Sequence, residues 1–129
     1  MAQSRPTPAP AGAPTPASVV SKAVIRAARH LGLTNAAVAD ILGLSEPTVS
    51  RLAAGTYALD PAGKPYELAL LLIRLFRGLD AMVGGEEAPM RAWMRSPNLA
   101  LAGIPADQVR SVSGLVEAVA YVDAARARL

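Results

Sequence analysis

A nearly unbroken apolar segment, residues 65–83, limits the folds open to this chain more than any other part of its sequence. Its apolar residues cover more than one face of a helix, whereas a helix in so small a domain can bury only one stripe against its own chain. We therefore expect a two-fold homodimer with this helix near the axis. The expected interface residues are Leu68, Leu72, Leu75, Phe76 and Leu79. The alternative is a central helix wrapped by the flanking parts of the same chain.

The composition favours an all-α fold and argues against catalysis. Of the 129 residues, 52% are hydrophobic but only 4% are aromatic, and a core rich in Ala, Leu and Val favours closely packed helices. With no Cys and a single His, the sequence excludes disulfides, thiolate zinc sites and His-rich metal sites. It also has no phosphate-binding glycine loop and no carboxylate pair in a defined pocket, so we expect no enzyme activity, no cofactor and no metal site.

Charge and hydropathy favour a cytoplasmic protein without a membrane partner. No run of 18 apolar residues is present, and prolines interrupt the N-terminal region where a leader peptide would need an apolar stretch. The chain carries 13 Lys and Arg against 10 Asp and Glu, a net charge of +3. The excess lies before residue 86, so any affinity for phosphate is N-terminal and modest.

Proline, glycine and capping residues divide the chain into four parts. Residues 1–17 hold five of the 11 prolines and are expected to form a disordered tail. Helical periodicity from Ser18 onward indicates a helix-turn-helix domain over 18–63, followed by a central apolar helix over 64–85. Residues 86–129 are expected to form a small helical module, with a helix over 88–95, an irregular piece over 99–109 and a closing helix that begins at Ser111.

The stretch NAAVADILGLSEPTVSRLAA, residues 35–54, predicts the helix-turn-helix. Ala39 is small where the two helices must cross closely, Gly43 accepts a positive φ in the turn, and Val49 anchors the second helix in the core. Thr34 and Ser45 are expected to cap the helices over 35–42 and 46–54. The alternative is an ordinary tight helical hairpin that has no DNA partner.

A recognition helix presents its outward N-terminal residues to the edges of the bases. The candidate DNA-binding residues are therefore Glu46, Thr48, Ser50 and Arg51, with Tyr57 as a backbone contact. Because so few cations accompany them, a monomer would bind DNA weakly. Operator DNA is thus a partner that we expect only for a dimer.

The stretch MRAWMRSPNLALAGIPADQV, residues 90–109, is the most distinctive in the sequence. Trp93, the only Trp, is a large anchor on an amphipathic turn, and Ser96 or Asn98 can cap the turn that follows. The helix that begins at Ser111 then places a row of apolar residues on one side. Considered alone, this part of the chain indicates only a small helical subdomain.

The combination of these parts is more specific. A helix-turn-helix, a Leu-rich helix, W-x-x-S-P-N-x-x-L, a G-x-P turn and a closing helix together resemble the Xre/MbcA/ParS antitoxin family over residues 18–129. The positions that match its toxin-binding module are Trp93, Pro97, Asn98, Leu101, Gly103, Pro105 and Gly114. The resemblance implies a type II antitoxin that dimerises, blocks the active site of a RES-type NAD-consuming or related ADP-ribosyltransferase-like toxin, and often represses its own operon.

From the resemblance and the polar residues of the last helix we expect a set of toxin-binding residues: Trp93, Asn98, Arg110, Asp123, Arg126, Arg128 and Leu129. The last three are expected to enter the active-site cleft of the toxin and block it, and are called the plug below. A cleft that accepts dinucleotide phosphates attracts cations. Alternatively, the arginines only complement the dipole of their helix. Two other functions remain open: a helix-turn-helix transcription regulator without a toxin partner, and a phage or plasmid partition adaptor.

Overall fold

The computed structural model describes residues 13–128, which fold into seven helices. They are α1 Pro16–His30, α2 Asn35–Leu42, α3 Glu46–Ala54, α4 Lys64–Val83, α5 Glu87–Arg95, α6 Pro105–Gln108 and α7 Val112–Arg126. Within the described residues the only β-type pairing is an isolated bridge between Asn98 and Gly103. The expected all-α fold is therefore confirmed.

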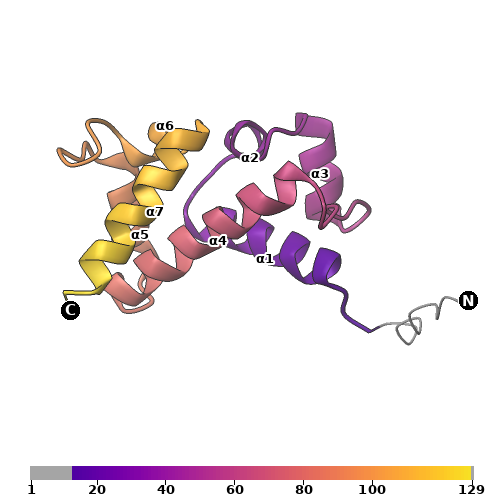
Figure 1. Cartoon of the computed structure of the whole chain (residues 1–129), viewed down its shortest axis with the longest axis horizontal. Helices are drawn as coiled ribbons and strands as arrows, with labels where there is room; N and C mark the ends of the chain where they lie inside the picture. Colours follow the sequence, from indigo (N-terminus) through magenta and orange to yellow (C-terminus); the bar gives the residue numbers. More distant parts are fainter. Residues whose placement is uncertain (1–12, 129) are drawn as a thin grey trace, which may run out of the picture.

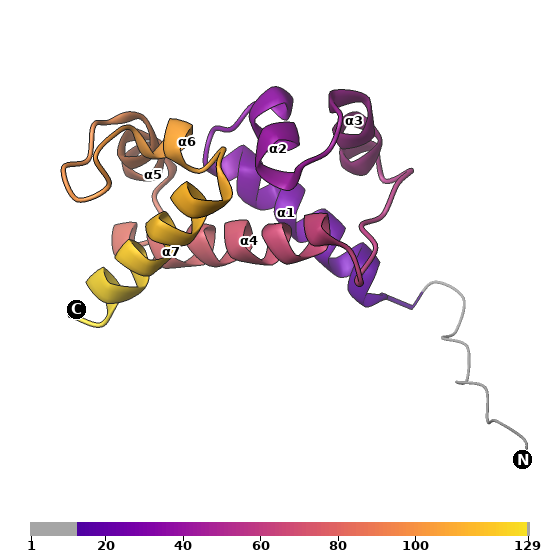
Figure 2. The same cartoon turned by 45° about the horizontal axis from the view of Figure 1, so that its top comes forward.

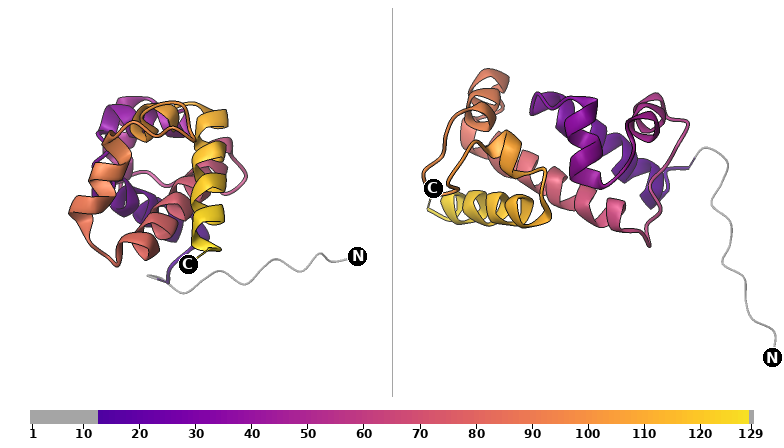
Figure 3. Two further views of the ribbon diagram at one scale, coloured as in Figure 1. Left: turned by 90° about the vertical axis from the view of Figure 1, so that its left-hand side faces the viewer. Right: turned by 90° about the horizontal axis from the view of Figure 1, so that it is seen from above.

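The longest helix, α4, runs along the base of the whole molecule (Figure 2). Helices α1–α3 lie over one half of it and α5–α7 lie over the other, so both groups of helices are built on this one helix (Figure 3, right). In Figure 1, α7 crosses one end of α4, and α1 crosses behind the same helix. The buried side chains of both groups form one continuous hydrophobic core.

Local capping chemistry sets the bounds of the helix-turn-helix. The side chain of Thr34 accepts a hydrogen bond from the amide of Ala37, and Gly43 ends α2 with a φ of 68°. In the same way, Ser45 accepts from the amide of Thr48, and Gly55 ends α3 with a φ of 80°. Both helices have the expected bounds, because Ser and Thr at the N-cap and glycine at the C-terminal end satisfy the free backbone groups.

The start of α1 differs from the expectation. The helix begins at Pro16, and its cap is Thr15, which forms a capping box with Ser18. Ser18 is thus not the N-cap but a residue of the first turn. Proline fits the first position of a helix, where the missing N–H has no partner to lose, so the end of the expected tail is helical. Residues 1–12 of that tail lie outside the described residues.

The expected dimer interface is wrong for three of its five residues. Leu72, Leu75 and Leu79 are fully buried inside the chain itself, because α1 and α7 pack onto α4 from two sides. Phe76 is half-buried and its ring stacks on His30 at 5.3 Å between centroids. Only Leu68 lies at the edge of an apolar surface that a second copy could reach. The wrapped central helix, the alternative reading of the sequence, describes the fold correctly.

Candidate DNA-binding and toxin-binding surfaces

Helix α3 presents one solvent-exposed face with the predicted DNA-binding side chains. Glu46, Ser50 and Arg51 are exposed, and the half-buried Thr48 lies between them. A guanidinium nitrogen of Arg51 donates to Oγ1 of Thr48 at 3.1 Å, and that hydroxyl also pairs with the Ser45 hydroxyl at 2.8 Å. Arg51 is thereby held over the N-terminal half of its helix, which is the part that a recognition helix places in the major groove.

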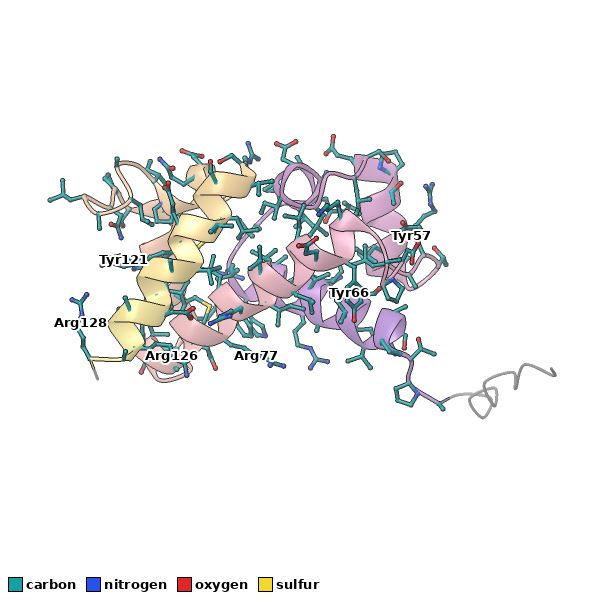
Figure 4. The ribbon with its side chains drawn as sticks, viewed as in Figure 1. Tyr57, Tyr66, Arg77, Tyr121, Arg126 and Arg128 are labelled. Carbon is teal, nitrogen blue, oxygen red and sulfur yellow. The ribbon has the colours of Figure 1, made fainter. Side chains whose placement is uncertain are left out.

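The core of the helix-turn-helix holds α3 in this position. Val49 and Leu52 point inward and are buried, and Ala39 is buried on α2. Tyr57 follows α3 in the loop and is half-buried against the core (Figure 4). The amide of Leu59 donates to the buried hydroxyl of Ser21 at 2.9 Å, which fixes this loop to α1.

Trp93 and Tyr121 join two helices of the C-terminal group. Their rings stack with centroids 6.2 Å apart and an angle of 27° between the planes. Both side chains are half-buried, so Trp93 acts as an anchor between α5 and α7 and keeps part of its ring at the surface. Stacked aromatic pairs of this kind hold adjoining helices in register.

Asn98 organises the loop between α5 and α6. Its side-chain oxygen accepts a hydrogen bond from the amide of Leu101 at 3.2 Å, and its backbone exchanges two hydrogen bonds with Gly103. Ala102 adopts a φ of 57°, a left-handed conformation that side chains rarely take. The result is a closed loop with Leu101 buried beneath it.

The same loop exposes Leu99 completely. Sequence reasoning missed this residue, since a Leu within N-x-x-L reads as a core position as easily as a surface one. Its exposure depends on the bridge between Asn98 and Gly103, which turns residue 99 outward while residue 101 turns inward.

Two more of the expected toxin-binding residues form contacts within the chain. Asp123 on α7 pairs with Arg74 on α4, with 2.7 Å between the closest nitrogen and oxygen. Arg110 lies 3.7 Å from Asp40 on α2. The first pair joins α7 to α4, the second joins the turn after α6 to α2, and both arginines stay exposed.

The remaining expected residues lie at the C-terminal end. Arg126 and Arg128 are exposed, and Figure 4 shows Arg128 beyond the end of α7, with Arg126 nearer to α4. Leu129, the last residue of the expected plug, lies outside the described residues.

A further group of cations lies along α1, and none of them is among the predicted site residues. Lys22, Arg26 and Arg29 border a hollow of about 520 Å³ between α1, α3 and α5. Arg91 crosses it, donates to the backbone oxygens of Arg29 at 2.8 Å and His30 at 3.3 Å, and pairs with Glu87. Arg91 thus joins the C-terminal group to the end of α1, where the partial negative charge of the helix carbonyls attracts a cation.

Comparison with known families decides what these two groups of helices are. Residues 10–74 match the antitoxin Xre-like helix-turn-helix domain, and residues 78–128 match the antitoxin Xre/MbcA/ParS C-terminal toxin-binding domain. The chain belongs to the Xre/MbcA/ParS antitoxin family. No curated protein matches the chain in a sequence search.

The two family domains meet within α4. The helix-turn-helix domain of this antitoxin includes the first part of α4, and the toxin-binding domain begins at Gly78 near its end. No helix among the described residues is long and apolar enough to cross a membrane.

Proposed function

We propose that this antitoxin neutralises a RES-type NAD-consuming toxin, or a related ADP-ribosyltransferase-like toxin, by blocking its active site. The observation that carries the proposal is the match of residues 78–128 to a toxin-binding domain that ends in two exposed arginines. A site that binds the phosphates of a dinucleotide attracts cations, so Arg126, Arg128 and Leu129 are the proposed plug.

The other proposed toxin-binding residues support this contact in different ways. Trp93 offers the exposed part of its ring, whereas Asn98 acts by holding the loop that presents Leu99. Arg110 and Asp123 border the surface with charges that are already paired within the chain. An exposed aliphatic side chain on a closed loop costs little conformational entropy when it enters a pocket of a partner.

The test is neutralisation by the intact chain. The reading frame beside the antitoxin gene is expressed from an inducible promoter with and without the antitoxin, and growth and cellular NAD are measured. We expect growth arrest and NAD loss with the neighbour alone, and recovery of both with the antitoxin, together with co-purification of the two proteins. If the neighbour causes no arrest, or the antitoxin neither binds nor relieves it, the proposed function is wrong.

We also propose that the helix-turn-helix domain represses the antitoxin's own operon. Arg51 and Ser50 on the exposed face of α3 support contacts to bases, and Thr48 supports the position of Arg51. Glu46, at the first position of α3, stabilises the positive end of the helix dipole and can accept from a cytosine amine. The proposed backbone contact is Tyr57.

A homodimer is part of this proposal, with its interface moved to a different surface. Leu68 and Leu71 of α4 and the exposed Val112 and Val116 of α7 border an apolar hollow of about 330 Å³. Its rim carries Lys64 and Glu67, which pair at 3.0 Å. A two-fold axis that passes between these two residues would set the cation of one copy against the anion of the other, so that the surface complements itself.

Sedimentation velocity at micromolar concentration tests the dimer. We expect the wild-type antitoxin to sediment as a dimer and Val116→Asp to sediment as a monomer, because the carboxylate would be buried without a partner. Val19→Asp, on another exposed apolar position, is the matched control and is expected to stay dimeric. A wild-type monomer would contradict the dimer.

A further inference from the structure

A second apolar groove crosses the boundary between the two family domains. It has a volume of about 340 Å³, and its floor is made of aliphatic residues of α1 and α4. Two of these, Val19 and Leu70, are large aliphatic side chains that are 52% and 46% exposed and line the same groove. The homodimer surface proposed above does not include them.

Three arginines form the rim of this groove, and no carboxylate among the described residues lines it. Arg74 is neutralised by Asp123, which holds it at 2.7 Å. Arg77 and Arg126 form no ion pair within the part of the chain that the structure describes. The groove therefore combines an apolar floor with two uncompensated positive charges.

The position of Arg126 is set by a glycine on the facing helix. A Cβ at Gly78 would collide with Val122 and would lie 3.5 Å from Cδ of Arg126. The missing side chain lets α7 approach α4, so that the aliphatic stem of Arg126 lies over α4. Figure 4 shows Arg77 and Arg126 along the same edge of the molecule, below α4.

The charges narrow the choice of occupant. A second copy related by a two-fold axis through the groove would set these arginines against their own counterparts, which is repulsive. Residues 1–12 of the same chain carry Arg5 and no Asp or Glu, so they offer the rim no opposite charge. Nucleic acid could pair with the arginines but would leave the aliphatic floor uncovered.

We propose that this groove is a second docking site for the toxin, and that it binds an acidic amphipathic segment of that protein. The aliphatic side chains of the segment cover Val19 and Leu70, and its carboxylates pair with Arg77 and Arg126. This inference rests on the proposed function, and it adds that the toxin reaches past the C-terminal module onto α1 and α4. Arg126 then acts at the groove and not in the plug, which leaves Arg128 and Leu129 to the plug.

Isothermal titration calorimetry with the purified product of the neighbouring reading frame tests the groove. We expect Arg77→Glu/Arg126→Glu to bind about ten- to a hundredfold more weakly than wild type at low salt, with a smaller difference at high salt. Leu70→Ser is expected to weaken binding about tenfold at either salt concentration, because it removes apolar contact area. The matched control, Arg26→Glu/Arg29→Glu, makes the same change in net charge at two exposed residues outside the groove and is expected to leave the affinity unchanged.

The outcomes separate this inference from the proposed function. If the wild-type antitoxin does not bind the neighbour, the proposed function fails and the groove proposal fails with it. If wild type binds and the groove variants bind equally well, or if the charge control is weakened as much as the groove variant, only the groove proposal is overturned. A groove variant that alters self-association while toxin affinity is unchanged also overturns it, by assigning the surface to a second copy. Far-UV circular dichroism verifies that each variant is folded.

Discussion

At the scale of single residues, the packing around Gly78 gives a clear structural reason for a glycine at this position. This glycine is buried in α4 at the point where α7 packs onto that helix, and Val122 occupies the space that a side chain would need. Glycine in a helix interior costs about 1 kcal/mol relative to alanine. Here close packing between the two helices outweighs that cost.

We expect Gly78→Ala to lower the free energy of unfolding by about 1–3 kcal/mol, because the new methyl group forces α7 away from α4. Urea denaturation measures the change. The double variant Gly78→Ala/Val122→Ala frees space for the methyl group and should be less destabilised than the sum of the two single variants. Strict additivity would show that the two residues are not in contact.

Arg51 is the residue on which we expect DNA affinity to depend most. Its substitution by Ala should cost about 1–3 kcal/mol of binding to the operator region upstream of the gene, because it removes a cation placed over the N-terminal half of α3. Fluorescence anisotropy with a labelled duplex measures the loss. Arg95→Ala, another exposed arginine at a helix end, is the control and should bind like wild type.

At the scale of elements, most helix bounds could be predicted because capping is local. Thr34, Gly43, Ser45 and Gly55 fix α2 and α3 through bonds that span only a few residues. The predicted start of α5, residue 88, is one residue late. The start of α1 was missed because proline-rich composition concealed a capping box.

The function of the C-terminal end can be separated from that of α7. Deleting residues 127–129 removes Arg128 and Leu129 but keeps the whole of α7, including Arg126. We expect the truncated antitoxin to bind the toxin and yet fail to inhibit it, since Arg128 and Leu129 of the proposed plug are gone while Arg126 and the other contacts remain. An NAD-cleavage assay beside a binding assay checks this. Full inhibition by the truncated chain would exclude the plug.

At the scale of the whole molecule, the burial of α4 was the feature that sequence reasoning mispredicted. Periodicity shows how many faces of a helix are apolar, but it does not show which segments cover them. Leu72, Leu75 and Leu79 are buried by α1 and α7, which lie far from each other in the sequence. The exposed Leu99 and the groove beside Arg126 escaped prediction for the same reason, because both depend on how distant segments meet.

Because one core spans both groups of helices, we expect a single cooperative unfolding transition. Trp93, the only Trp, reports on the C-terminal group by fluorescence, and far-UV circular dichroism reports on all helices. The two signals should coincide in urea. Leu75→Ala should move both midpoints down together, with a loss of about 2–5 kcal/mol. Two separate transitions would show that the groups fold independently.

The packing of both groups of helices on α4 also limits how such a protein can be re-engineered. A graft that joined residues 78–128 of a relative to this chain would set a foreign α7 against Arg74 of α4 and a foreign α5 against the end of α1. We therefore expect that neither domain can be exchanged for that of a relative without loss of contacts between the two domains. A change of partner would therefore be made through substitutions at exposed positions, while the residues packed between the two domains are kept.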